Sequence, residues 1–426
     1  MKVGVKKRKD MTSSGGSGMD DRLQEQMHER MNRKPMKLAA ILGALGAFAP
    51  LSIDMYLPAL PHIAKELHTS QSIVQLSLTF FLFGLVLGQL MVGPISDAKG
   101  RRKPLLFGLL VYAVCSLLCI FAPTIELFIV LRFLQGVSGA SGIVLSRAIL
   151  RDVFSGKKLT KVFAMLALVQ GAAPVLAPVL GGIILLFAPW KGVFLFLAVV
   201  GLVMFFIVLF YLPESLDVRM RSKGSIKETF ITFKKLFLDR SFIGYALVIA
   251  FLFTMMFAYI SGSSFVFQEM YGLSAQLYSL IFAVNGIGIV LCSQLTGRLV
   301  GIVSEKKLLV TGIGLSFVGT AVLLVLLLLK AKIYFILPPL FLAIASMGMV
   351  NTSGQSLALQ NQGKVAGSAS ALLGVLQYVI AGSFAPLTGL GNDPSVSMGI
   401  VMMIGSVFAI LSYLFLIRKN QVVTDK

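Results

Sequence analysis

The chain has 426 residues, of which 57% are hydrophobic and only 13% are charged. Soluble globular proteins are roughly half apolar and roughly a quarter charged, so this composition excludes a soluble protein and indicates a membrane protein. The net charge of +20 does not indicate nucleic-acid binding, because the basic residues gather in short loops between apolar stretches, as membrane topology requires.

Residues 1–36 are polar and rich in Lys and Arg, and they predict a disordered cytosolic tail. Apolar segments long enough to cross a bilayer follow one another from there on. Their approximate limits are 37–61, 72–95, 104–122, 125–150, 162–188, 193–213, 242–267, 275–300, 308–329, 333–356, 365–389 and 396–417. The sequence therefore predicts an all-α membrane protein with twelve transmembrane helices.

The basic residues predict the orientation of these helices. If both termini are cytosolic, 32 of the 38 Lys and Arg residues lie on the cytosolic side and only four on the other side. Basic loops stay in the cytosol, so this asymmetry predicts that both termini, including the short tail 418–426, are cytosolic.

The longest loop, residues 214–241, separates six spans from six. It contains seven basic residues and an amphipathic stretch, 226–238, which we expect on the inner membrane surface. This division predicts two pseudo-symmetric six-helix bundles, 37–213 and 242–417, around a cavity at the middle of the membrane.

One acid lies deep in the first span. The nearest flanking charges, Lys37 and Lys65, are 28 positions apart, which is about 42 Å of helix. Asp54 lies within one turn of the midpoint, whereas nearly all the other acids occupy tails, loops or helix borders. A carboxylate at that depth needs a partner, a water-filled cavity or a proton. We interpret Asp54 as a proton or cation site; a permanently paired acid that orders the bundle is the alternative.

Arg132, in the fourth span, is the predicted partner cation. It lies six residues from Glu126, about 9 Å below the outer edge, while Asp54 lies about 16 Å below Lys65. The arginine side chain spans this difference directly or through a polar bridge, so a proton could be loaded and released as the pair breaks and forms. The alternative is that Arg132 extends outward to the lipid headgroups.

The fifth span contains prolines and small residues that predict a kinked, closely packed helix. The residues concerned are Pro174, Ala177, Pro178, Gly181 and Gly182. A kinked seam suits a moving interface, although packing alone would also explain it.

The loop between the second and third spans forms a basic turn with one acid. Its residues of interest are Gly93, Asp97, Gly100, Arg101 and Arg102. Arg147 and Arg151 lie four residues apart on one helix face near the cytosolic end. We expect them to make ionic contacts there, with Asp152 and Asp97 as partners.

These motifs together resemble the major facilitator superfamily. The turn at 93–102 is similar to its signature G-x-x-x-D-x-x-G-R-R, and 132–136 is similar to R-F-x-Q-G in the fourth helix. Residues 177–182 resemble the antiporter motif G-P-x-x-G-G, with alanine at the first glycine. Residues 54–61 and 146–152 resemble the Bcr/CflA branch of drug:proton antiporters. The second half retains only a degenerate loop signature without an acid.

The resemblance implies alternating access in the inner membrane of a bacterium. It implies that Asp54 takes up protons, that Arg132 couples to it, and that the Asp97 turn latches the cytosolic side in the outward-open state. We therefore expect proton-coupled efflux of drugs or other small apolar compounds by a monomer. Substrate contacts are expected among the polar, aromatic and sulfur-containing residues at mid-span depth, namely Tyr56, Gln170, Met256, Tyr259, Asn285 and Gln377.

Other functions fit less well. A transporter dedicated to one amino-acid-like or sugar-like metabolite stays open as the alternative. A receptor or scaffold would need a soluble domain, and the loop at 214–241 is too short for one. An enzyme is not expected, because none of the three His residues is deep and no G-x-S-x-G motif occurs. The three cysteines lie in apolar stretches and indicate buried thiols rather than a metal site, and no cofactor is expected.

Overall fold

A computed structural model describes residues 35–221, 226–362, 365–391 and 393–418. These residues are helical or in connecting turns, apart from one isolated bridge between Val300 and Val303. Twelve of the helices are long and apolar enough to cross a membrane, which confirms the predicted fold class. The predicted N-terminal tail falls almost entirely outside the described residues, as does nearly all of the C-terminal tail.

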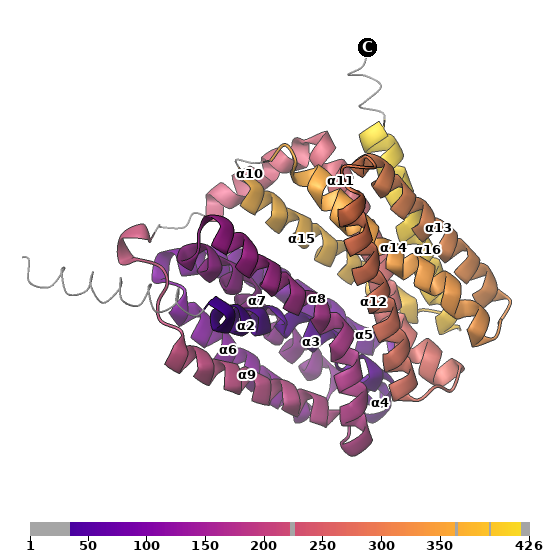
Figure 1. Ribbon diagram of the computed structural model, residues 1–426. Helices are drawn as coiled ribbons and strands as arrows, with labels where there is room; N and C mark the ends of the chain where they lie inside the picture. Colours follow the sequence, from indigo (N-terminus) through magenta and orange to yellow (C-terminus); the bar gives the residue numbers. More distant parts are fainter. Residues whose placement is uncertain (1–34, 222–225, 363–364, 392, 419–426) are drawn as a thin grey trace, which may run out of the picture.

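The helices fall into two groups in space (Figure 1). The first half consists of α2 (Pro35–Gly46), α3 (Phe48–Asp54), η1 (Leu57–Ala59), α4 (Leu60–Glu66), α5 (Gln71–Lys99), α6 (Arg102–Ile120), α7 (Ile125–Val153), α8 (Gly156–Phe187) and α9 (Lys191–Tyr211). The connection contains η2 (Val218–Met220) and α10 (Ile226–Leu238). The second half consists of α11 (Arg240–Phe265), η3 (Val266–Met270), α12 (Ala275–Leu299), α13 (Glu305–Leu328), α14 (Ile333–Leu359), α15 (Ala366–Phe384), η5 (Ala385–Gly389), α16 (Pro394–Ser412) and η6 (Tyr413–Arg418).

Prolines divide the first span, which was predicted as one helix over 37–61. A proline has no N–H to donate to the carbonyl four residues earlier. Pro58 therefore leaves the Asp54 carbonyl without its helical donor, and Pro61 does the same to Leu57. The chain responds by ending α3 at Asp54 and passing through the short 3₁₀ turn η1 before α4 resumes and ends at Glu66. Asp54 thus lies at a break in the helix.

Glycines let α5 and α7 pack with their backbones close together. A Cβ atom on Gly84 would lie 2.2 Å from the Phe133 carbonyl oxygen, and one on Gly136 would lie 2.2 Å from the Phe81 carbonyl oxygen. Small residues permit such approach between membrane helices, where packing rather than water drives association. This contact fixes α7, and with it Arg132, against the rest of the first half.

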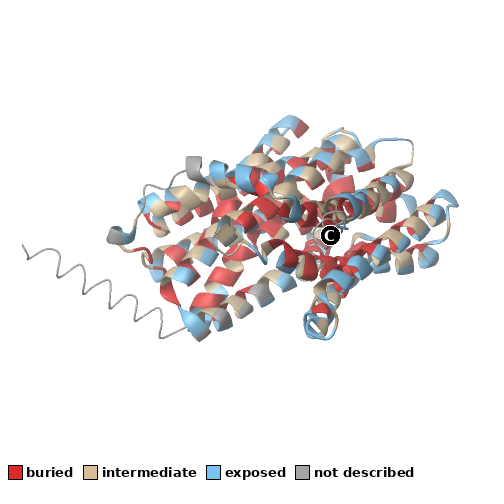
Figure 2. Cartoon of the chain, turned by 90° about the horizontal axis from the view of Figure 1, so that it is seen from above, coloured by how far each residue is buried: buried red, intermediate tan, exposed pale blue. Residues whose placement is uncertain are grey.

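The amphipathic stretch predicted at 226–238 is the helix α10. Phe233 and Leu236 are buried, whereas Lys234 and Lys235 are exposed. The apolar face contacts α11 and α15, so the helix covers one end of the second half (Figure 1). Over the spans themselves, exposed residues are mostly apolar and lie on the outer sides of the helices (Figure 2), as expected for surfaces that face lipid.

Between described residues, the hydrogen bonds that cross from one half to the other lie toward the end of the molecule that carries Lys65, hereafter the Lys65 end. Gln75 Nε2 donates to the Ser261 carbonyl at 2.9 Å, and Thr388 Oγ1 donates to Gln75 Oε1 at 3.1 Å. An ion pair of 3.3 Å joins Lys65 to Glu269. At the opposite end, which carries the α5–α6 turn and Asp97, no such bond joins the described parts of the two halves. Among the described residues, the polar contacts between the halves therefore lie at the Lys65 end.

Replacing Gly136 by alanine should lower the stability of the folded protein, because the added methyl group would collide with the α5 backbone rather than with a movable side chain. We expect a loss of about 1–3 kcal/mol, measured as a lower midpoint of thermal unfolding in detergent. Gly297→Ala is the matched control, since a Cβ atom at this other helical glycine meets nothing within 4 Å. Equal midpoints for the two variants would contradict the packing argument.

Candidate functional site

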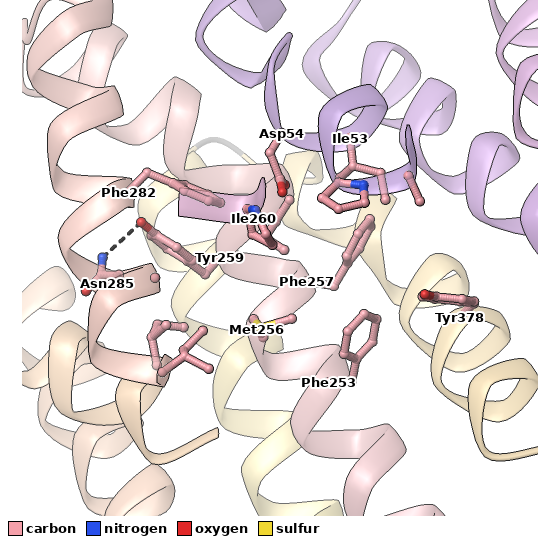
Figure 3. Close-up of a pocket in the computed structure, with 16 residues that line it drawn as sticks. Ile53, Asp54, Phe253, Met256, Phe257, Tyr259, Ile260, Phe282, Asn285 and Tyr378 are labelled. Carbon is pink, nitrogen blue, oxygen red and sulfur yellow. Dashed lines mark hydrogen bonds between the residues drawn. The ribbon is translucent and has the colours of Figure 1, made fainter. Parts of the chain in front are cut away.

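A cavity of about 210 Å³ lies between the two halves (Figure 3). Helices from both halves form its wall, and most of the groups that face it are apolar or aromatic. The lining residues are Ala49, Pro50, Ile53, Asp54, Pro174, Phe253, Met256, Phe257, Tyr259, Ile260, Phe282, Asn285, Gly286, Ile289, Ile344 and Tyr378. A concave, mostly apolar site with few polar groups is the usual form of a small-molecule binding site.

Asp54 is the one lining residue that carries a carboxyl group. Its side chain is 5% exposed and points from the end of α3 toward Tyr259 and Ile260 (Figure 3). It makes no hydrogen bond or ion pair with any residue that the structure describes. An ionised carboxylate without a partner is costly in such surroundings, so this position favours a group that is neutral or that meets a cation.

Arg132 is fully buried on the other side of α3 and does not reach Asp54. One guanidinium nitrogen donates to the Ser52 carbonyl at 2.8 Å and another donates to Gln135. The guanidinium carbon of Arg132, Cζ, lies 4.3 Å from the centre of the Tyr56 ring and 4.4 Å from the centre of the Phe81 ring. The predicted direct pair with Asp54 is therefore absent from this structure, and the alternative that Arg132 extends to the headgroups is wrong, because it has no exposed surface.

The rotation of α3 explains why these two charges are apart. Residues two positions apart point to nearly opposite sides of a helix. Ser52 faces the first half, where its hydroxyl lies 2.6 Å from the Tyr112 hydroxyl, whereas Asp54 faces the second half. The link between Asp54 and Arg132 thus runs through the α3 backbone.

A chain of hydrogen bonds between buried polar side chains supports Arg132. Gln135, which accepts a hydrogen bond from Arg132, in turn donates to the Ser116 hydroxyl at 2.6 Å, and Ser116 donates to the Tyr112 carbonyl at 2.7 Å. Gln135 belongs to the fourth-helix motif, but no motif distinguishes Ser116 or Tyr112. The chain of bonds keeps the guanidinium in a fixed orientation.

The second half supplies the aromatic wall. Phe253, Phe257 and Ile260 repeat at helical spacing on one face of α11. The Tyr259 ring stacks on Phe282 with centroids 5.3 Å apart, and its hydroxyl accepts a hydrogen bond of 2.9 Å from Asn285. The aromatic spacing was visible in the sequence, but the same spacing is typical of ordinary helix packing.

Half of the residues expected to contact substrate line the cavity. Met256, Tyr259 and Asn285 do so. Tyr56 does not, because its ring lies against Arg132 and its hydroxyl lies 3.0 Å from Ser77. Gln170 packs against Gly46 instead. Gln377 does not line the cavity either, whereas its neighbour Tyr378 does.

The proline-containing seam is part of the uninterrupted helix α8. Pro174 lines the cavity, and Ala177 is fully buried. A Cβ atom on Gly181 would lie 1.9 Å from the Met55 carbonyl oxygen, so only glycine allows α8 this close to the break in the first span. Gly182 faces the second half, and its carbonyl accepts a hydrogen bond of 3.0 Å from Gln276. Pro178 is buried between these contacts.

The basic turn between α5 and α6 is held within the first half. Arg101 bonds to Asp97 and, through Nε at 3.0 Å, to Asp152, which also accepts from the Ser215 hydroxyl at 2.9 Å. Partial burial lowers the pKa of Arg101, but the hydrogen bonds to Asp152 and Asp97 outweigh burial and raise it. The positive φ of Gly100, +87°, turns the chain into α6.

Arg147 and Arg151 do not make the predicted ionic contacts. Both side chains are exposed, and in the described part of the chain Arg101 forms ion pairs with both Asp97 and Asp152. Arg101 takes this place because it enters the turn directly beside both acids. Arg102 instead bonds to the Leu209 carbonyl at the end of α9, and Gly93 has open space where a side chain would be.

A family comparison decides the identity of the fold. The model named Major Facilitator Superfamily matches residues 42–386. The chain belongs to the major facilitator superfamily. It is therefore a membrane transporter with many spans. As a separate observation, nothing in the described residues brings three His, Cys, Asp or Glu side chains together as a metal site would require.

Curated relatives within the superfamily cover nearly the whole chain. The chain is 42% identical to "Uncharacterized MFS-type transporter YdgK" of Bacillus subtilis, over 92% of this chain and 98% of that protein. It is 30% identical to "Bicyclomycin resistance protein homolog" of Haemophilus influenzae, over 89% and 96%. It is 29% identical to "Multidrug resistance protein MdtL" of Vibrio parahaemolyticus, over 88% and 94%. These relatives confirm the resemblance to Bcr/CflA-type drug transporters.

Solved structures with the superfamily fold are similar at low sequence identity. An inward-facing, unoccupied bacterial homologue of the human lysosomal transporter Spinster matches with a TM-score of 0.69, 12% identity, and coverage of 89% of this chain and 96% of that one. The partially occluded inward-open xylose transporter XylE from E. coli matches with a TM-score of 0.67, 13% identity, and coverage of 90% and 98%. These likenesses confirm the fold alone.

Glu214 supports the turn at 93–102, and the sequence motif did not predict this role. It lies just after α9 and accepts hydrogen bonds from the backbone N–H groups of Arg101 at 2.7 Å and Arg102 at 3.2 Å. The same carboxylate accepts from the N–H groups of Ser215 and Leu216, both at 3.1 Å. It thus caps the start of α6 and ties it to the segment that leaves the first half.

Replacing Glu214 by alanine should loosen the start of α6, because the uncapped N–H groups lose their acceptor. The expected loss of stability is about 1–2 kcal/mol, measured by thermal unfolding, with Glu214→Gln in between because its amide oxygen still accepts. Glu305→Ala is the control, since this acid at the start of α13 accepts, among the described residues, a single exposed hydrogen bond, from Ser356. A Glu214 variant as stable as the control would remove the capping role.

Proposed function

We propose that this transporter exports drugs or other small, mostly apolar compounds in exchange for protons, with Asp54 as the proton site. The observation that carries the proposal is the unpartnered carboxyl group on the wall of an otherwise apolar and aromatic cavity. Such a group is stable when neutral and becomes stable as an anion only beside a cation. A proton and the approach of Arg132 are the two means available to it.

Alternating access connects the cavity to one side of the membrane at a time. The halves are fastened at the Lys65 end, so this conformation offers the cavity to the side of the Asp97 end. The basic loops support a cytosolic Asp97 end, with both termini in the cytosol and the Lys65 end outside. With that orientation, we infer that this conformation is the inward-facing state, and we propose that it receives substrate from the cytosolic side of the inner membrane of a bacterium.

The cycle follows from the two states of Asp54. In the inward-facing state described here, Asp54 lies away from Arg132 and is protonated. Release of the proton to the cytosol allows substrate to bind and brings the ionised carboxylate toward Arg132. Protonation from the outside, after the halves have rocked, breaks that pair, releases the substrate and favours return to the inward-facing state.

The Asp97 turn serves the opposite state. In our proposal, the partly buried Asp97 and the exposed Arg147 and Arg151 at the cytosolic end meet the second half when that end closes, which latches the outward-open state. Glu214 keeps the turn ready for this contact by holding the start of α6. Each chain contains its own pathway between the bundles 37–213 and 242–417, so we propose that a monomer is the working unit.

The names of two relatives, a bicyclomycin resistance protein homologue and a multidrug resistance protein, support drugs as substrates. A transporter for one amino-acid-like or sugar-like metabolite is the alternative. Growth inhibition by a panel of toxic compounds, in cells that lack or overproduce the protein, with and without a protonophore, separates the two. Broad, protonophore-sensitive protection is expected from our proposal.

Asp54→Asn should abolish efflux driven by a pH gradient in proteoliposomes while some substrate binding persists, because the amide cannot take up or release the proton. Efflux rates are compared with and without an imposed gradient. Glu126→Gln, an exposed acid at the start of α7, is the control and should transport normally. Gradient-driven efflux by Asp54→Asn at the control's rate would refute the proton role.

Arg132→Ala should remove the proton release that follows substrate addition, since the ionised Asp54 would have no cation to meet. Release is followed with a pH-sensitive dye in weakly buffered detergent solution. The variant should also lose roughly 1–3 kcal/mol of stability, because the Ser52 carbonyl loses its donor. Arg132→Lys retains the charge but not the planar contacts, so it should keep part of the signal. A normal signal from Arg132→Ala would reduce the residue to a structural anchor.

A further inference from the structure

Two side chains of the second half bind the backbone of the first span just beyond Asp54. The Ser264 hydroxyl donates to the Leu57 carbonyl at 2.6 Å, and Gln268 Nε2 donates to the Pro58 carbonyl at 3.0 Å. Gln268 Nε2 also lies 2.8 Å from the Ser264 hydroxyl. These bonds join α11 and its extension η3 to the turn η1 across the boundary between the halves.

The prolines explain why this turn receives side chains from another helix. Pro61 has no N–H for the Leu57 carbonyl, which keeps only the shorter-range bond from the Leu60 N–H. A backbone carbonyl inside a membrane protein needs a partner, and with no water at hand another helix can supply it. Ser264 is fully buried, so its hydroxyl is not exchanged for water while the halves are together.

The same segment is held from the other side by the first half. Arg132 donates to the Ser52 carbonyl at 2.8 Å, and Gly181 allows α8 to pack against the Met55 carbonyl. Asp54 therefore lies in a segment, Ser52–Pro58, whose start is bound by the first half and whose end is bound by the second half. Any movement of Asp54 toward Arg132 must displace this segment.

We propose that Ser264 and Gln268 are positioning residues that couple closure of the Lys65 end to the proton on Asp54. This inference rests on the proposed proton exchange. While Asp54 is neutral, the segment keeps its place, and the Leu57 and Pro58 carbonyls keep α11 fastened. When Asp54 is ionised and turns toward Arg132, the carbonyls leave Ser264 and Gln268, and the Lys65 end opens.

Other groups in or near this segment can carry or gain charge. The segment itself contains Tyr56, and the elements packed around it contribute Tyr112 and Cys119 on α6, Arg132 on α7, Tyr259 on α11, Tyr278 on α12, Tyr378 on α15, and the more exposed His62, Lys65 and Glu269 beside η1 and η3. His62 is the one histidine among them. A pH response of the Lys65 end must therefore be separated from His62 by its own variant.

The experiment measures the opening of the Lys65 end in the full-length protein in lipid nanodiscs. Spin labels are placed at Phe121 and Tyr334, exposed positions near the Lys65 ends of α6 and α14, with the three native cysteines replaced. Distance distributions between the labels are recorded from pH 5 to pH 9. In the otherwise unchanged protein, we expect the short distance at low pH and a growing fraction of the long distance as the pH rises.

The double variant Ser264→Ala with Gln268→Met removes both donors and keeps the size of the side chains close to the original. We expect the ratio of long to short distances to rise roughly tenfold or more at low pH, and its pH dependence to flatten. Ser263→Ala is the matched control, because the neighbouring buried hydroxyl bonds to Tyr278 within the second half, at 3.3 Å. It should keep the pH response, as should His62→Asn.

The outcomes separate this inference from the proposed function. A double variant with the control's pH response would overturn the coupling, and so would loss of the response in His62→Asn. If the double variant does not fold, Gln268→Met alone must shift the ratio in the same direction, and no shift would equally overturn it. Asp54→Asn must stay closed at all pH values; an unchanged pH response in that variant would instead sink the proton role of Asp54.

Discussion

A carboxyl group inside an apolar bundle must be neutral or beside a cation, and this constraint governs the centre of the molecule. Among the described residues Asp54 has no counter-charge in this conformation, while the buried cation Arg132 is occupied with a carbonyl, an amide and two aromatic rings. Both charges are fixed in one half, on opposite sides of the same short helix. In the proposed cycle, a rearrangement of α3 that turns Asp54 toward Arg132 exchanges one way of satisfying the constraint for the other, and the two states would then differ in a proton.

The two halves divide the work between them. The first half holds its charge with polar bonds, from Arg132 through Gln135 to Ser116, and with close glycine contacts between α5 and α7. The second half contributes mainly the aromatic face of α11 and α12 to the cavity. A rigid charged half opposite an apolar half is consistent with the proposed transport of compounds of different shape, since dispersion and burial of apolar surface are not directional. The hydrogen bonds between the halves lie outside the cavity, at the Lys65 end.

Apolar length predicted the spans, and the isolated acid predicted the site, because both depend on the cost of polar groups in lipid. Measured by helical rise, Asp54 and Arg132 lie at similar depths in the membrane, which is why the sequence predicted a pair. Depth does not show which side of its helix a residue faces, and in the structure the pair is not formed. The break after Asp54 could have been predicted from the sequence, because Pro58 and Pro61 lie four residues after Asp54 and Leu57 and lack the N–H that each of their carbonyls needs. Glu214 could not have been foreseen, since its role depends on α9 ending beside the start of α6. Likewise, the face of α11 that contains Phe253 and Phe257 reads like any packed helix until its neighbours are known.

The polar groups of the cavity also bear on the kind of guest it receives. A site for a sugar-like or amino-acid-like metabolite needs several donors and acceptors in fixed positions, because each polar group of the guest must replace its bonds to water. Among the lining residues, Asn285 and Tyr259 already bond to each other, which leaves Asp54 and the Tyr378 hydroxyl as the main uncommitted polar side chains. Two such side chains cannot replace all the hydrogen bonds to water that a polyhydroxylated substrate would lose on binding. They match the proposed substrates, compounds that are mostly apolar and have one or two polar atoms, for which burial against the aromatic wall would supply the larger part of the binding energy.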